Sequence, residues 1–131
     1  MNPPASGKLN ILVADDEQSS VISVAVVLRQ GGHTVDSVAD GAEALARLAE
    51  KPRHYHIVIT DHFMLQVSGL ELMAQLRATG FCGKIVVLSA NLDNELMASY
   101  RALGADSFIR KPFALAELRE AVEHLGTMMD Y

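Results

Sequence analysis

The stretch "YHIVITD", residues 55–61, decides the fold class of this sequence. Its apolar and β-branched run ends abruptly on Asp61, a pattern typical of a buried strand. The stretch that follows at 68–80 begins with Ser68, has Glu71 three residues later and ends at Gly80. Those are the start and stop signals of a helix. A strand followed at once by a helix is half of a βαβ unit, which predicts a parallel sheet.

The same alternation extends in both directions along the chain. Further strands are predicted at 9–15, 33–39, 84–90 and 106–110, and further helices at 17–32, 40–51, 94–104 and 115–128. The stretch 17–32 is ambiguous, because its Val and Ile content favours a strand, but its length and its closing glycines favour a helix. We therefore expect an α/β fold with a doubly wound, five-stranded parallel sheet. The expected type is flavodoxin-like, with strand order 2-1-3-4-5 and helices on both faces.

Composition and charge exclude several classes of protein. The chain has 131 residues, half of them hydrophobic, and a formal net charge of -5. This acidic balance disfavours direct binding to nucleic acid, because the phosphate backbone would be repelled. No apolar run reaches the roughly 18 residues that a membrane-spanning helix needs, so we expect no membrane association. The single Cys82 allows neither an internal disulfide nor a cysteine-based zinc site.

The domain organisation expected from the sequence is simple. We predict a flexible N-terminal tail at 1–7, one domain at 8–128 and a short tail at 129–131. Without a Pro/Gly/Ser-rich linker we expect no attached output domain. The start of the chain lacks the apolar core of a signal peptide, so we expect a cytoplasmic protein.

Polar residues end the predicted strands and define a candidate site. Asp15 and Asp16 end the first strand, and Asp61 ends the third. In a doubly wound sheet the carboxyl ends of the strands share one edge, where ligands bind. Two unit charges about 4 Å apart repel by roughly 4 kcal/mol at an effective dielectric of about 20. A hard divalent cation would offset this repulsion, and oxygen ligands suit Mg²⁺ or Mn²⁺.

Ser89 and Lys111 end the fourth and fifth strands at the same predicted edge. Lys111 could be a counterion of Asp61 or a clamp for an incoming anion, and the Ser89 hydroxyl could donate to an anionic oxygen. Metal, ammonium and hydroxyl together are the parts that stabilise a transferring phosphoryl group. An aspartate can serve as the nucleophile and carry that group as an acyl phosphate.

These motifs together resemble the response-regulator receiver domain of two-component signalling. The resemblance extends over about residues 8 to 126. Its motifs are "ILVADDE" (11–17), "IVITDHFM" (57–64) with "SG" (68–69), "VVLSA" (86–90) and "GADSFIRKPF" (104–113). The set is specific, whereas "DD" or "KP" alone would mean little. One departure is Leu65, which stands where the family often has proline.

The resemblance implies a role for each matching position. Asp61 matches the phosphoacceptor, Asp15 and Asp16 match the acidic pair that binds Mg²⁺, and the backbone carbonyl of Phe63 would complete the metal site. Lys111 and Ser89 match the residues that hold the phosphoryl oxygens. Phe108 matches the aromatic switch position. The family's lysine–proline peptide bond is cis, which would direct Lys111 towards Asp61.

The resemblance also implies the partners. A histidine kinase or a histidine phosphotransfer protein would donate the phosphoryl group. An effector would bind the face formed by the fourth helix, fifth strand and fifth helix, and a homodimer through that face is left open. The domain would catalyse only its own phosphorylation and dephosphorylation, so we expect no turnover enzyme.

Three rival functions stay open at this point. The domain could be an interaction module that works without phosphorylation. It could be a phosphoester hydrolase, although such enzymes usually carry a D-x-D arrangement on the first strand. A nucleotide-binding half-fold is disfavoured because the turn after the first strand has no glycine.

His54 and His56 could form a metal pair, but they begin the third strand, at the edge opposite the acids, and no third ligand is evident. His62 is interpreted as a loop imidazole near the mouth of the site.

Overall fold

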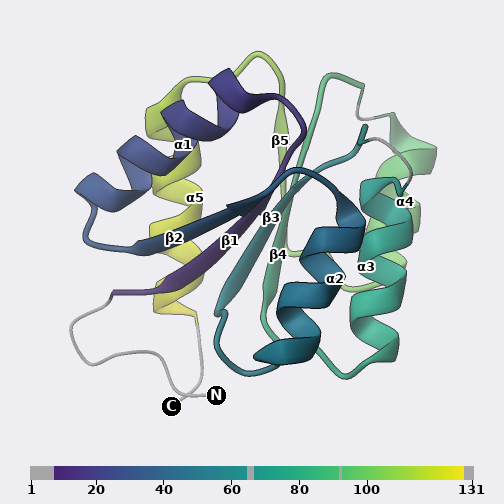
Figure 1. Cartoon of the computed structure of the whole chain (residues 1–131). Coiled ribbons are helices and arrows are strands. Elements are labelled where there is room, and N and C mark those ends of the chain that lie inside the picture. The colour runs from purple at the N-terminus through teal and green to yellow at the C-terminus, as the bar shows by residue number, and fades with distance from the viewer. Residues whose placement is uncertain (1–7, 65–66, 92, 129–131) are drawn as a thin grey trace.

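The computed structural model describes residues 8–64, 67–91 and 93–128 of the chain. Strands and helices alternate along these ranges (Figure 1). The elements are β1 (Asn10–Ala14), α1 (Gln18–Gln30), β2 (Thr34–Val38), α2 (Gly41–Glu50), β3 (Ile57–Asp61), α3 (Gly69–Ala78), β4 (Lys84–Ser89), α4 (Asn94–Ala102), β5 (Ser107–Arg110) and α5 (Leu115–Thr127). The predicted alternation is confirmed, including the helix within 17–32. The predicted tails, 1–7 and 129–131, and Leu65 lie outside the described residues.

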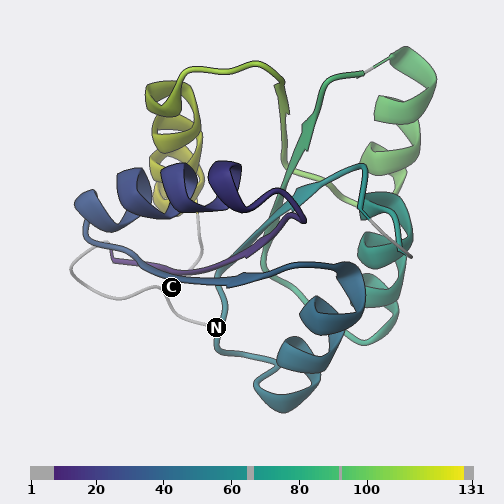
Figure 2. The same cartoon turned by 45° about the horizontal axis from the view of Figure 1, so that its top comes forward.

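The sheet is parallel and has the order β2-β1-β3-β4-β5, as predicted. Helices α1 and α5 cover one face, and α2, α3 and α4 cover the other (Figures 1 and 2). The register pairs Ala14 with Thr60, and Asp61 with Leu88. It follows that β1, β3 and β4 end side by side. Asp61, Ser89 and the residues that follow Ala14 therefore lie at one edge of the sheet.

The alternation of side chains along each strand explains why both faces of the sheet are apolar. Ile11 and Val13 of β1 pack under α1 and α5, whereas Leu12 and Ala14 pack under the helices of the opposite face. Neighbouring side chains of a strand point to opposite faces, so a strand covered by helices on both sides must be apolar throughout. This requirement explains the uninterrupted apolar runs, and it makes the polar residues at their ends conspicuous.

Helix boundaries follow the capping signals of the sequence. The Asp40 carboxylate accepts a hydrogen bond from the Glu43 amide at 2.8 Å, and the Ser68 hydroxyl accepts one from the Glu71 amide at 3.1 Å. Gly80, beyond the end of α3, has a φ of +91°, a conformation that glycine adopts without strain. Ala114, at the start of α5, offers no side-chain cap. These caps fix where each helix begins relative to the strand end before it.

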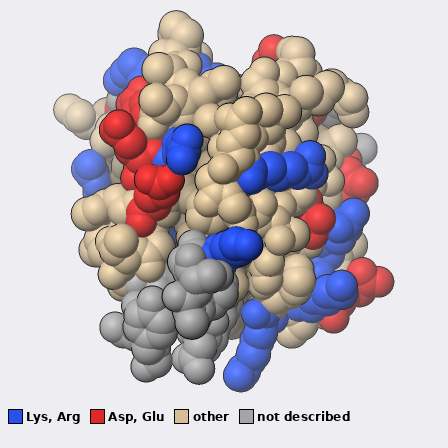
Figure 3. All heavy atoms as spheres, turned by 90° about the vertical axis from the view of Figure 1, so that its left-hand side faces the viewer, with Lys and Arg blue, Asp and Glu red and all other residues tan. Residues whose placement is uncertain are grey.

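The surface carries the acidic balance of the composition. Figure 3 shows one side of the molecule, on which Asp and Glu side chains form a group at the left and Lys and Arg side chains are spread over the rest of the face. Helix α5 exposes Glu117, Glu120 and Glu123. In the part of the chain that the structure describes, no helix is long and apolar enough to cross a bilayer.

Candidate phosphoacceptor and metal site

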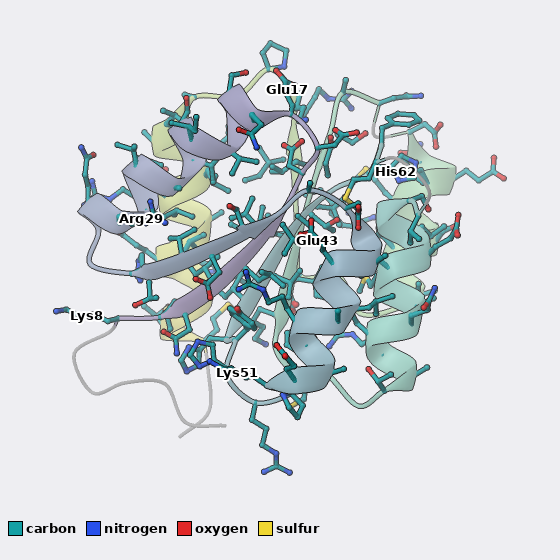
Figure 4. The ribbon with its side chains drawn as sticks, viewed as in Figure 1. Lys8, Glu17, Arg29, Glu43, Lys51 and His62 are labelled. Atoms are coloured by element: carbon teal, nitrogen blue, oxygen red, sulfur yellow. The ribbon has the colours of Figure 1, made fainter. Side chains whose placement is uncertain are left out.

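The candidate site lies at the edge of the sheet where the strands end. Figure 4 shows Glu17 and His62 at this edge, and Lys8 and Lys51 at the opposite edge, where strands begin. Glu17 follows the acidic pair after β1, and His62 follows Asp61 at the end of β3. The two loops that carry the predicted acidic residues therefore open on the same side of the molecule.

The three predicted carboxylates converge. One oxygen from each of Asp15, Asp16 and Asp61 lies within 4.8 Å of the others. Asp15 and Asp61 are buried, whereas Asp16 is exposed. An oxygen of Asp15 also accepts a hydrogen bond from the Glu17 amide at 2.9 Å, which fixes its orientation. This all-oxygen donor set, partly open to solvent, fits a hard divalent cation such as Mg²⁺, which keeps part of its water shell.

A cavity of about 190 Å³ adjoins the two carboxylates that follow β1. Ser37 and Glu43 contribute to its wall from the neighbouring β2 and α2. The cavity gives a small, hydrated group access to the acidic cluster from the side of β2.

Lys111 provides the positive charge of the site. Its ammonium lies 3.2 Å from an oxygen of Asp61 and 3.9 Å from an oxygen of Asp15. The Lys111 amide donates to the Ser89 carbonyl at 2.9 Å, which ties the end of β5 to the end of β4. The Lys111–Pro112 peptide bond is cis, as the resemblance implies. In this arrangement Lys111 serves as the counterion of Asp61, the first of the two roles left open above.

Opposing influences act on the ionisation of Asp61. Burial raises the pKa of its carboxyl, while the Lys111 ammonium and the backbone amide of Phe63 lower it, and the Asp15 charge raises it. The net direction is upward, because burial disfavours the charged form more than these partners favour it. Additional positive charge at the acidic cluster would favour the ionised, nucleophilic form.

Ser89 is the last residue of β4 and is buried. Its hydroxyl accepts a hydrogen bond from the Asn91 amide at 3.1 Å and lies 3.3 Å from the Asn91 carbonyl. The hydroxyl is thus held by its own loop at the rim of the site, on the strand next to Asp61.

Phe108, the predicted switch residue, lies half-buried on β5. Its ring meets the Tyr100 ring edge-on at a centroid distance of 6.2 Å, and the Arg101 guanidinium lies 5.2 Å from its centroid. The other aromatic residue predicted at the site, Phe63, exposes 64% of its surface beside Asp61.

Sequence reasoning missed one residue near the site, Tyr100 of α4. It is fully buried, and its hydroxyl lies 2.6 Å from Nδ1 of His62. Leu96, Tyr100 and Leu103 follow helical spacing and all pack in the core on one face of the sheet. A tyrosine on such a stripe needs a partner for its hydroxyl, and that requirement was the available signal.

The histidines before β3 are used structurally. His56 is buried, and its Nδ1 accepts a hydrogen bond from the Asn10 amide at 2.9 Å. The ring of His54 meets the Tyr55 ring edge-on. This agrees with the preference for a structural role over a metal pair.

Comparisons with known proteins define the class to which this fold and site belong. Residues 11–123 match the family model of the response regulator receiver domain. The chain therefore belongs to the family of response regulator receiver domains, a family of two-component signalling proteins. The resemblance inferred from the motifs is confirmed.

Individual relatives agree with this assignment. The transcriptional regulatory protein CutR of Streptomyces coelicolor is 33% identical over 118 residues, which are 90% of this chain and 54% of CutR. The response regulator MprA of Mycobacterium ulcerans is 39% identical over 112 residues, 84% of this chain and 47% of MprA. The chain thus spans about half the length of these curated relatives.

Solved structures show the same fold. The chemotaxis protein CheY4 of Vibrio cholerae superposes with a TM-score of 0.84 at 26% identity, covering 90% of this chain and 98% of that one. The Francisella response regulator 1452 receiver domain gives a TM-score of 0.83 at 27% identity, with 92% and 98% covered.

Proposed function

We propose that Asp61 is the phosphoacceptor of this receiver domain and takes its phosphoryl group from a phosphohistidine. The observation that supports this role most strongly is the convergence of the Asp15, Asp16 and Asp61 carboxylates opposite the Lys111 ammonium. The donor would be a histidine kinase or a histidine phosphotransfer protein, the partners that the family implies.

The chemistry follows from the positions of the groups. An oxygen of Asp61 attacks phosphorus, and the P–O bond forms as the P–N bond to the donor's imidazole breaks. The electron pair of the broken bond stays on the imidazole, whose other ring nitrogen carries the proton that keeps the leaving group neutral. Lys111 and the Ser89 hydroxyl hold the phosphoryl oxygens. Water later hydrolyses the acyl phosphate and restores the Asp61 carboxylate.

The proposed metal site consists of the carboxylates of Asp15, Asp16 and Asp61 and the backbone carbonyl of Phe63. Mg²⁺ or Mn²⁺ bound there would supply positive charge to the phosphoryl oxygens. The protein's own contribution is to hold three mutually repelling acids within 4.8 Å, with Asp15 fixed by the Glu17 amide.

A groove of about 460 Å³ beside the site suits the phosphodonor protein. Lys111 lines this groove and also contacts Asp61, so a partner that fills the groove brings its histidine to the acceptor. Leu115 of α5 also lines the groove and exposes 38% of its surface, which offers an apolar contact to that partner.

The output of the domain would be a population shift. A phosphoryl group on Asp61 competes for the Ser89 hydroxyl, which now contacts Asn91, and a movement of Ser89 alters the neighbouring β5 with Phe108. The face of α4, β5 and α5 would present this change to an effector or to a second copy of the chain. We place this signalling in the cytoplasm.

Intact-mass spectrometry after incubation with acetyl phosphate and Mg²⁺ tests the proposal. Wild type should gain the mass of one phosphoryl group, stable in acid and lost in base. Asp61→Asn should gain none, and removal of Mg²⁺ with EDTA should abolish the gain. Asp106→Asn is the matched control, because Asp106 pairs with Lys84 and the Ile85 amide at the start of β4.

Failure of wild type to gain mass would contradict the proposal and favour an interaction module that works without phosphorylation. Steady turnover of a chromogenic phosphoester would instead favour the hydrolase. An uptake that survives in Asp61→Asn would place the acceptor elsewhere.

A further inference from the structure

The side chain of Tyr100 has a single polar atom, its hydroxyl oxygen, and the fold brings that atom to the loop after Asp61, which we call the acceptor loop. The side chain comes from α4, is fully buried, and places its hydroxyl oxygen 2.6 Å from Nδ1 of His62. Within the described residues this is the only hydrogen bond of the Tyr100 hydroxyl. A buried hydroxyl that lost it would be left without a hydrogen-bond partner, which destabilises the folded chain.

The direction of this hydrogen bond can be deduced. Burial and the nearby Asp61 charge raise the pKa of the Tyr100 phenol, so the phenol keeps its proton. With no other acceptor in the described structure, that proton is donated to Nδ1 of His62. This donation uses the tautomer of His62 that carries its ring proton on Nε2, in which Nδ1 accepts a hydrogen bond from α4.

His62 is the residue through which the hydroxyl reaches the site. It directly follows Asp61, its amide donates to the Leu88 carbonyl at 3.0 Å, and its carbonyl accepts from the Gly69 amide at 2.9 Å. The backbone amide of the next residue, Phe63, favours the ionised Asp61 carboxylate and lowers its pKa. His62 and Phe63 share a peptide bond, so a displacement of the His62 backbone would move the Phe63 amide and carbonyl relative to the acceptor.

Gly69 packs closely against the Tyr100 hydroxyl. A Cβ atom on Gly69 would lie 2.6 Å from the Tyr100 hydroxyl and 2.7 Å from the Asp61 carbonyl. The bare glycine at the start of α3 therefore lets helix α4 and the acceptor strand approach each other. The Tyr100 ring also meets Phe108 edge-on, so the same side chain contacts the acceptor loop and the switch residue.

We propose that Tyr100 is a positioning residue for phosphoryl uptake: its hydroxyl holds His62, and through His62 it sets the backbone of Phe63 beside Asp61. This inference rests on the proposed function of Asp61. The inference adds a specific hydrogen bond between helix α4 and the loop after Asp61. Tyr100→Phe removes this hydrogen bond but keeps the aromatic ring in the core.

The test measures the rate constant of phosphoryl uptake from acetyl phosphate at saturating Mg²⁺, by intact mass, for a double-mutant cycle. Tyr100→Phe should slow uptake roughly fivefold, the size expected for one lost buried hydrogen bond. His62→Ala should slow it comparably, and the double variant should be no slower than the slower single variant. His62→Asn, which keeps an acceptor close to the position of Nδ1, should restore most of the wild-type rate.

Tyr55→Phe is the matched control. Tyr55 is also buried, with 2% of its surface exposed, and its hydroxyl donates to Asp36 at 2.6 Å, away from the site. The Tyr55→Phe variant should lose stability, as Tyr100→Phe does, but should keep the wild-type rate of phosphoryl uptake. A wild-type rate in Tyr100→Phe, or losses that multiply in the double variant, would overturn the inference and leave the proposed function standing. A wild type that takes up no phosphoryl group would instead overturn the proposed function, and this inference with it.

Discussion

His33 shows at the residue scale how incomplete hydrogen bonding of a buried ring makes stability depend on pH. The side chain is 7% exposed, and its Nδ1 accepts a hydrogen bond from the Leu9 amide at 3.1 Å. The proton of the neutral ring is then on Nε2, which is buried without a hydrogen-bond partner in the described structure. Burial lowers the pKa of His33. The charge of Glu123 opposes this shift, and the charge of Arg119 adds to it.

The sign of the resulting pH dependence follows from linkage. The unfolded chain binds a proton at His33 more readily than the folded one, so the stabilising contribution is complete above the ordinary pKa of 6.5. It is lost as pH falls from that value through the lowered folded pKa. We expect the free energy of unfolding of wild type, measured in urea, to fall over this range.

His33→Asn should show a flatter profile over the same pH range, because it keeps an acceptor for the Leu9 amide and does not titrate. The control is His124→Asn, on the exposed side of α5. Identical pH profiles for wild type and His33→Asn would contradict this assignment.

Single residues differed in how far they could be predicted. Asp15, Asp61 and Ser89 interrupt apolar strands, and a polar residue there is informative because it must end at a strand terminus or be paired. Tyr100 carried a weaker signal, since a tyrosine within a helical stripe looks like any core residue. Its partner His62 could be placed near the site, but the contact depends on how α4 packs against the loop after β3, which local sequence does not specify.

At the element scale, helix starts were predictable where a cap is encoded locally, as at Asp40 and Ser68. Hydrogen bonds between elements that lie far apart in the sequence could not be predicted. Arg77, in the last turn of α3, donates hydrogen bonds to four carbonyls from two loops, at distances of 2.9–3.1 Å. The carbonyls belong to Phe81, Gly83, Leu103 and Gly104. In the sequence Arg77 is only a basic residue near a helix end.

Arg77 should therefore contribute strongly to stability. Arg77→Met keeps much of the apolar stem but leaves several carbonyls without their donor, so we expect a loss of about 2–4 kcal/mol in the free energy of unfolding. Arg119→Met is the control, because Arg119 forms an exposed pair with Glu123, which contributes about 0.5 kcal/mol at most. Equal midpoints of urea unfolding for the two variants would contradict the role given to Arg77.

For the whole molecule, the parallel topology turns scattered polar residues into one site. Five strands in the order β2-β1-β3-β4-β5 place the ends of β1 and β3 side by side, so acids 45 positions apart in sequence, Asp16 and Asp61, come together. The parallel sheet and the convergence could be predicted from the alternation of elements, and the strand order from the flavodoxin-like type of fold. Individual distances could not, because they depend on loop conformations.

Convergence of three acids predicts that metal stabilises the entire domain. At a free Mg²⁺ concentration of ten times Kd, the free energy of unfolding should rise by about 1.4 kcal/mol relative to EDTA. Asp16→Asn should lose most of this gain, because it removes an exposed carboxylate of the cluster with little effect on packing. A wild-type unfolding midpoint that is the same in Mg²⁺ and in EDTA would contradict the metal site.

The role proposed for Asp61, as the residue that carries the phosphoryl group, can be tested directly. Borohydride reduction of the protein after incubation with acetyl phosphate and Mg²⁺ converts an aspartyl phosphate to homoserine, which peptide mass spectrometry locates. We expect homoserine at position 61 and unmodified aspartate at positions 15 and 16. Homoserine at either of those two positions, or at none of the three, would contradict it.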